Sequence, residues 1–120
     1  MKQVYYLKTC STCQRILKEW GLSEDFELRE IKSKPITEIE IDHMKALAGS
    51  YEALFSKRAQ LYKQRNLKEQ NLSEEDMKSL ILEHYTFLKR PVLIYENQLF
   101  IGNSAKTVSA AKEFLTANER

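Results

Sequence analysis

The chain has 120 residues, of which 42% are hydrophobic and 30% charged, so it is long enough to bury a core without disulfide staples. Its 19 basic and 17 acidic residues give a formal charge of +2, too balanced to predict direct binding to nucleic acid or a membrane. The sequence has no apolar run of membrane-spanning length and no basic segment leading into an apolar signal core. We therefore expect a single cytoplasmic domain, in which cysteines stay mostly reduced.

The N-terminal stretch predicts a buried strand, a turn that carries two cysteines, and a helix. Residues 4–7 form a β-branched and aromatic run of strand length, and an apolar stripe with helical spacing starts at Ile16. Cys10 and Cys13 lie between these elements. The cysteine pair is therefore expected at a strand-to-helix junction.

This junction favours a thiolate at Cys10. The first N–H groups of a helix are unpaired, and the helix dipole places partial positive charge there. In such contexts the pKa of a cysteine falls from about 8.5 to roughly 3.5–7.5. Cys13, three residues on, would lie on the same face of the first turn, close enough to form a disulfide after a small adjustment. The spacing indicates an attacking thiol, Cys10, with a resolving thiol, Cys13.

Two other interpretations of the cysteine pair stay open. The pair could be half of a zinc site, for which His43 and His84 are the remaining soft ligands, although neither has ligand spacing. Both cysteines could instead be inert and buried, although their polar neighbours are unusual for buried cysteines.

A second strand should follow the first helix. Gly21 is placed to end that helix, and Phe26 and Leu28 alternate with charged residues up to Ile31, as in a strand with one solvated face. Strand, helix and strand within about thirty residues form a βαβ unit with parallel strands.

The middle of the chain is predicted to be helical. Thr37 and Glu40 predict a capping box and a helix over about residues 38–47, with Ile39, Met44 or His43, and Leu47 on the inner stripe. Short helical turns are expected over residues 51–65, with a solvated basic face. Ser73 should cap a helix that runs to about residue 85.

The C-terminal part predicts a hairpin and a helix. Two short apolar runs, 92–95 and 98–101, flank the turn dipeptide Glu96-Asn97, and Pro91 stands directly before the first run. Asn103 or Ser104 can cap the last helix. Its expected inner stripe is Val108, Ala111, Phe114 and Leu115.

Three segments together resemble the arsenate reductase (ArsC)/Spx family. They are Cys10-Ser11-Thr12-Cys13, the stretch 55–58 (Phe-Ser-Lys-Arg), and the stretch 88–94 (Leu-Lys-Arg-Pro-Val-Leu-Ile). The resemblance covers nearly the whole chain. It implies an α/β, thioredoxin-like fold in the order β-α-β, helical insertion at about 36–88, β-β-α, with a mixed four-stranded sheet flanked by helices in one domain spanning 1–120.

The resemblance also implies roles for site residues. Cys10 matches the nucleophilic cysteine, and Arg90 matches the arginine that holds an oxyanion beside it. A guanidinium suits this role because its planar fork of donors fits an oxyanion and its charge favours the thiolate. Pro91 would be a cis-proline facing Cys10. The catalytic residues implied are Cys10, Cys13 and Arg90, and the binding residues are Arg58, Pro91, Ser11 and Thr12.

Two functions follow from this resemblance. The first is an arsenate reductase-like thiol oxidoreductase that acts on an oxyanion or a disulfide and is reduced by thioredoxin, glutaredoxin or glutathione, without metal or organic cofactor. The glutaredoxin-linked reductases, however, have one cysteine in this turn and a third arginine near the position of Gly102. The second function follows from the cysteine pair itself, which is the Spx-like pattern: a redox-switched regulator that binds the C-terminal domain of the RNA polymerase α subunit.

Overall fold

The computed structural model describes residues 1–119, and the chain forms two compact units. The first unit comprises Met1–Lys34 and the segment that begins at Arg90, and the second comprises Pro35–Lys89. The expected organisation as one domain with an insertion stays a prediction.

The first unit is built on a mixed four-stranded sheet, as expected from the resemblance. The strands are β1 (Lys2–Tyr6), β2 (Glu27–Glu30), β3 (Val92–Tyr95) and β4 (Gln98–Ile101). Their order in the sheet is β2-β1-β3-β4. The central strands β1 and β3 are antiparallel, β1 and β2 are parallel, and β3 and β4 form the predicted hairpin.

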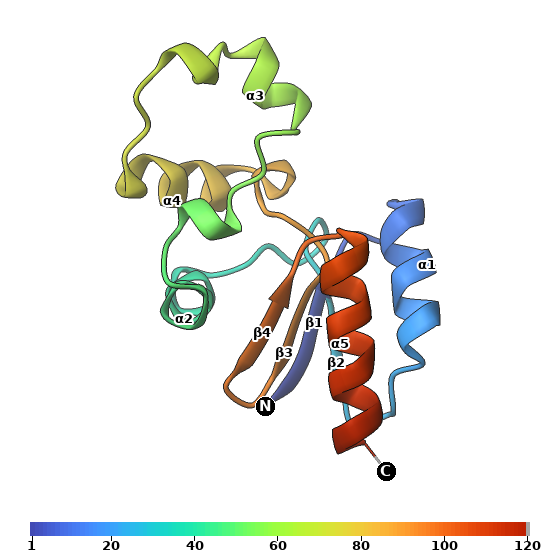
Figure 1. Cartoon of the computed structure of the whole chain (residues 1–120). Helices are drawn as coiled ribbons and strands as arrows, with labels where there is room; N and C mark the ends of the chain where they lie inside the picture. Colours follow the sequence, from blue (N-terminus) through green and yellow to red (C-terminus); the bar gives the residue numbers. More distant parts are fainter. Residues whose placement is uncertain (120) are drawn as a thin grey trace. The chain divides into compact units, whose positions relative to one another are not determined.

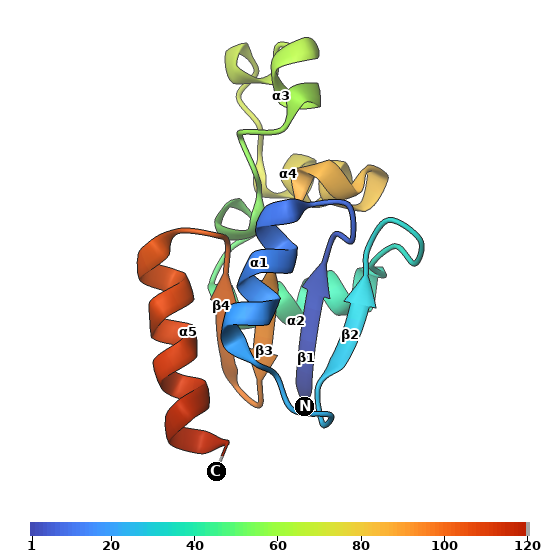
Figure 2. The ribbon, with the colours of Figure 1, turned by 90° about the vertical axis from the view of Figure 1, so that its right-hand side faces the viewer.

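Two helices, α1 (Ser11–Trp20) and α5 (Ala105–Asn118), lie on the same face of this sheet (Figures 1 and 2). The end of α1 at Gly21 has a left-handed φ of 57°, and Ser104 caps α5, so both predicted boundaries are confirmed. The indole N–H of Trp20 donates to the Val108 carbonyl at 3.1 Å and so joins the two helices. The buried core between helices and sheet is Val4, Ile16, Trp20, Phe26, Leu93, Val108, Ala111 and Leu115.

Leu28 lies on the core side of the sheet, as predicted, but it is not buried there. In the sheet, Leu28 pairs with Val4, and Val4 pairs with Leu93, so the three side chains share one face. Val4 and Leu93 are fully buried, whereas Leu28 is 52% exposed. The difference arises because β2 is an edge strand, so Leu28 has a neighbouring strand on one side only.

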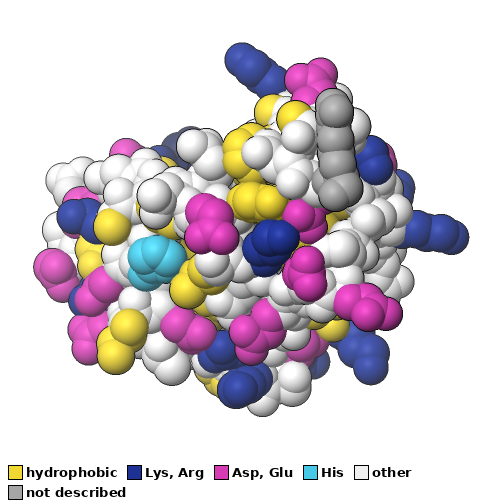
Figure 3. All heavy atoms as spheres, turned by 90° about the horizontal axis from the view of Figure 1, so that it is seen from below, with side chains coloured by type: hydrophobic (Ala, Val, Ile, Leu, Met, Phe, Trp, Pro, Cys, Tyr) yellow, Lys and Arg dark blue, Asp and Glu magenta, His cyan; other side chains and the backbone are white. Residues whose placement is uncertain are grey.

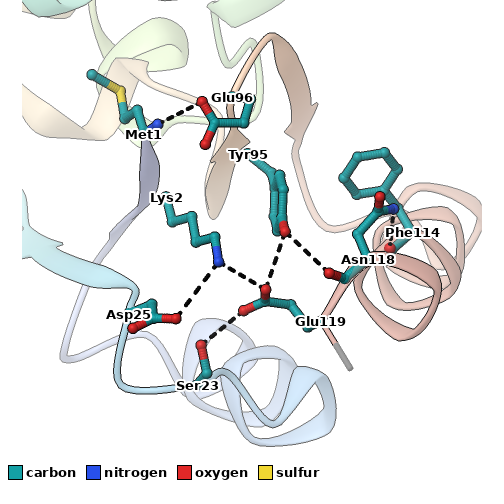
Figure 4. Close-up of polar contacts among 9 residues, drawn as sticks. All are labelled: Met1, Lys2, Ser23, Asp25, Tyr95, Glu96, Phe114, Asn118 and Glu119. Atoms are coloured by element: carbon teal, nitrogen blue, oxygen red, sulfur yellow. Dashed lines mark hydrogen bonds and ion pairs between the residues drawn. The ribbon is translucent and has the colours of Figure 1, made fainter.

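A polar cluster of Lys2, Ser23, Asp25, Tyr95 and Glu119 lies at the end of this unit that carries Met1 (Figure 4). The Lys2 ammonium contacts Glu119 at 2.8 Å and Asp25 at 3.6 Å. Glu119 also accepts hydrogen bonds from the Ser23 hydroxyl at 2.8 Å and the Tyr95 hydroxyl at 3.1 Å. These contacts attach the end of α5 to β1, β3 and the turn before β2.

The second unit consists of the helical segments α2 (Glu38–Ala48), η1 (Glu52–Leu54), α3 (Gln60–Gln64), η2 (Leu67–Glu69), α4 (Glu74–Glu83) and η3 (Tyr85–Phe87). The starts of α2 and α4 were predicted correctly. Thr37 and Glu40 form a complete capping box at α2, and Ser73 and Asp76 form another at α4.

The predicted inner stripe of α2 is partly wrong. Ile39 is 84% exposed, and the buried side chains are Ile41 and Met44. Ile39 and Ile41 are two residues apart, about 200° around the helix axis, so they cannot share one face. His43 and Leu47 are half-buried beside that stripe.

Ion pairs and hydrogen bonds join α2, η1 and α4. The Glu74 carboxylate accepts from the backbone N–H groups of Tyr51 and Glu52 at 2.7 and 3.0 Å. Lys78 on α4 contacts Glu38 and Asp42 on α2 at 2.8 and 3.1 Å. Since these contacts link segments far apart in sequence, they fix the helices of this unit to one another.

Acidic and basic side chains are interspersed on the face of the molecule shown in Figure 3. This mixture agrees with the balanced composition of the chain. Within residues 1–119, no helix is both long enough and apolar enough to cross a membrane.

The row of side chains across the sheet gives a test of the core. We expect Leu93→Ala to lower the free energy of unfolding by about 2–5 kcal/mol, because it leaves a cavity under α1 and α5. Leu28→Ala is the matched control in the same row and should cost about 0.5 kcal/mol or less. Urea denaturation measures both values. Equal losses in the two variants would contradict this assignment of the core.

Candidate functional site

Cys10 occupies the N-cap of α1, directly after the turn that leaves β1. Its backbone is extended, with φ −88° and ψ 111°, and its carbonyl accepts the N–H of Gln14 at 3.1 Å, the first hydrogen bond of the helix. The Cys10 N–H donates back to the Leu7 carbonyl at 3.1 Å. This confirms that the thiol lies at the strand-to-helix junction.

The surroundings of Cys10 lower its pKa below that of an ordinary cysteine. Partial burial acts in the opposite direction and raises the pKa. The backbone N–H and the thiol of Cys13, the charge of Arg90, and the backbone N–H of Thr12 outweigh it. All of these groups stabilise negative charge on the Cys10 sulfur, which is therefore the better thiolate of the pair.

Cys13 has the opposite environment. Its side chain is fully buried in the first turn of α1, and burial raises its pKa to about 11. A backbone interaction with Leu7 lowers the pKa, but the charge and side chain of Cys10 raise it again. Both cysteines are free thiols in this structure. The two sulfurs thus interact directly and differ strongly in acidity.

Arg90 and Pro91 directly precede β3, and the peptide bond between them is cis, as the resemblance implied. Gly102, after β4, donates its N–H to the Pro91 carbonyl at 3.0 Å and holds this segment in place. The Arg90 side chain is half-buried, and its positive charge lowers the pKa of both cysteines. The structure therefore brings together Cys10, Cys13 and Arg90.

The other predicted residues are placed differently. Ser11 is the exposed first residue of α1, and Thr12 is half-buried and directs its backbone N–H toward Cys10. Arg58 is exposed and belongs to the second unit, in the turn between η1 and α3, so its part in the site stays a prediction. Among residues 1–119, no three His, Cys, Asp or Glu side chains are arranged to hold a metal ion.

Sequence reasoning missed two residues that hold the cysteine turn. Glu30, the last residue of β2, accepts the Lys8 N–H at 2.9 Å, and the Gln14 side chain donates to the Lys8 carbonyl. The ends of parallel strands meet at one edge of a sheet, so Glu30 could have been placed beside the turn from the βαβ pattern. The Gln14 contact has no comparable signal in the sequence.

The sheet with α1 and α5 on one face, a cysteine turn after β1 and a cis-proline before β3 define a thioredoxin-like fold. The solved structure of the arsenate reductase from Vibrio cholerae is similar, with a TM-score of 0.72 and 18% identity, covering 93% of this chain and 97% of that one.

Sequence comparisons identify the family. The family model described as ArsC family matches residues 5–111. The global transcriptional regulator Spx of Bacillus subtilis is 26% identical over 105 residues, and Spx 2 of Bacillus anthracis is 30% identical over 109. Each match covers 85% of this chain and 79% of the relative. The chain belongs to the ArsC family.

The contrast between the two thiols can be tested by alkylation. Near neutral pH we expect iodoacetamide to label Cys10 well before Cys13, because the thiolate is the reactive form. Fragmentation of the tryptic peptide 9–15 in a mass spectrometer locates the label. In Arg90→Met, labelling of Cys10 should slow, since the lost cation no longer lowers its pKa. Preferential labelling of Cys13 would contradict the assignment.

Proposed function

We propose that this ArsC-family chain is a thiol-based oxidoreductase, similar to the arsenate reductases, with Cys10 as nucleophile and Cys13 as resolving thiol. The observation that carries this proposal is the difference in acidity between two interacting thiols. Cys10 is partly accessible and has a lowered pKa, whereas Cys13 is buried with a pKa of about 11. The first attack therefore falls to Cys10.

With a disulfide substrate, the Cys10 thiolate attacks one sulfur, forms a mixed disulfide and releases the other sulfur as a thiolate. Cys13 then loses its proton and attacks the Cys10 sulfur. This step forms the Cys10–Cys13 disulfide and releases the second substrate thiol. The substrate gains two electrons from the pair, and an external thiol reductant, such as thioredoxin, glutaredoxin or glutathione, restores the dithiol.

With arsenate, the Cys10 sulfur bonds to arsenic and water leaves. Attack of Cys13 on the Cys10 sulfur then breaks the sulfur–arsenic bond, and its electron pair reduces arsenic(V) to arsenic(III). In this proposal Arg90 would hold the oxyanion, since its charge acts on Cys10 and a guanidinium fits an oxyanion. The same two thiols supply the electrons in both reactions.

The two steps are coupled through charge. Burial raises the pKa of Cys13 most, and the negative charge and side chain of Cys10 raise it further. When Cys10 is bonded to substrate, its charge is gone, so the pKa of Cys13 falls, while the effect of burial remains. The resolving thiol thus becomes a better nucleophile after the first step.

Reductant consumption tests this function. With thioredoxin or glutaredoxin systems, we expect oxidation of NADPH that depends on added arsenate or on a small disulfide. Cys10→Ser should abolish it, since no nucleophile remains. In Cys13→Ser the first adduct should accumulate and be visible by mass spectrometry. Turnover that persists in Cys10→Ser would refute the proposed nucleophile, and turnover with the disulfide alone would exclude arsenate as substrate.

A second candidate is an Spx-like redox-switched regulator. It is favoured by the two relatives named above, which are both global transcriptional regulators, and one of them is 30% identical. In this function the Cys10–Cys13 pair would change the affinity for the C-terminal domain of the RNA polymerase α subunit.

Calorimetric titration with that purified domain separates the two candidates. A regulator should bind it with an affinity that differs between the dithiol and disulfide forms, and should show no reductant turnover. Cys10→Ser is the control, because it cannot form the internal disulfide and should keep one affinity under both conditions. Absence of binding in both forms would rule out this candidate.

A further inference from the structure

The peptide unit of Lys8 is held from both sides. Its N–H donates to the Glu30 carboxylate at 2.9 Å, and its carbonyl accepts from the side-chain amide of Gln14. Lys8 stands in the middle of the turn 7–10, whose own hydrogen bond runs from the Cys10 N–H to the Leu7 carbonyl. The path of the chain from β1 into α1 is therefore fixed two residues before the nucleophile.

Glu30 is itself held rigidly. Its second oxygen accepts the backbone N–H and the hydroxyl of Ser33, both at 2.8 Å. One residue further on, the Ile31 N–H donates to the Tyr6 carbonyl at 3.0 Å and continues the pairing of β2 with β1. A carboxylate bound at both oxygens and anchored to the neighbouring strand is a firm support for the cysteine turn.

We propose that Glu30 is a positioning residue, which acts through the Lys8 peptide to hold Cys10 against the first N–H groups of α1. This inference rests on the proposed role of Cys10 as the nucleophile. Gln14 supports the same peptide from the helix side. Neither residue contacts the Cys10 sulfur in the described contacts, so both act through the backbone.

The charge of Glu30 makes this role testable. A negative charge near the turn disfavours the Cys10 thiolate, so removing that charge should by itself increase the thiolate fraction. Loss of the Lys8 contact should decrease it, because the turn would relax and the sulfur would move from the N–H groups of Thr12 and Cys13. The two roles therefore predict opposite changes in the thiolate fraction of Cys10 when Glu30 is truncated. Loss of the charge alone would increase it, and loss of the positioning contact would decrease it.

The experiment measures the rate of Cys10 alkylation against pH in the full chain. In Glu30→Ala we expect labelling at about pH 6.5 to slow by roughly two- to fivefold. This is the size of effect expected when a negative charge loses its interaction with a helix N-terminus. Glu30→Gln keeps an oxygen that can accept the Lys8 N–H, so it should label at least as fast as wild type. Glu27→Ala, an exposed glutamate at the other end of β2, is the matched control and should label like wild type.

Circular dichroism first confirms that each variant is folded. If Glu30→Ala is unfolded, Gln14→Ala takes its place, and the same slowing is expected. Unchanged or faster labelling in a folded truncation variant would overturn the positioning role. Labelling reports on Cys10 without any substrate, so this result is independent of turnover. A wild-type Cys10 that titrates like a free cysteine would instead count against the proposed function.

Discussion

Two cysteine sulfurs lie at the N-terminus of one helix, where a negative charge on one disfavours a negative charge on the other. This repulsion determines the properties of the whole site. The α1 N-terminus and Arg90 stabilise a thiolate, and either cysteine could receive that benefit in principle. Burial decides between them, because the Cys13 side chain is fully buried in the first turn of α1, whereas Cys10 at the N-cap is partly accessible. The charge on Cys10 then makes ionisation of Cys13 more costly still. The two thiols therefore differ although they are three residues apart.

The pairing of the strands explains how Arg90 comes close to Cys10 and Cys13. Strands β1 and β3 are antiparallel, with Tyr5 opposite Val92. The residues that follow β1 and those that precede β3 consequently emerge at the same edge of the sheet. Cys10 comes from the first of these segments and Arg90 from the second. A single strand pairing thus brings together residues eighty positions apart in sequence.

Much of the fold and of the cysteine site could be predicted because the decisive sequence signals are local. Helix caps at Thr37 and Ser73, the hairpin turn, and the cysteine turn each depend on a few neighbouring residues. Errors occurred where burial depends on position in the fold. Leu28 fits a strand pattern, yet its strand lies at the edge of the sheet, and Ile39 fits a helix, yet on the wrong face. Glu30 was missed although the βαβ pattern could have placed it, because its contact with Lys8 joins two segments that are separated in sequence by the first helix.

The proposed mechanism also uses one cation twice. Before the reaction, the charge of Arg90 stabilises the Cys10 thiolate. Once Cys10 is bonded to arsenic or sulfur, that negative charge has gone, and in the proposed mechanism the charge of Arg90 would act on an oxyanion of the adduct or on the Cys13 thiolate as it forms. A redox switch needs only stabilisation of the Cys13 thiolate, because its cysteine pair forms and breaks a disulfide without holding an oxyanion. The same asymmetric pair can therefore serve as the centre of a reductase or of a regulator, and an oxyanion-binding role for Arg90 is what would distinguish the reductase.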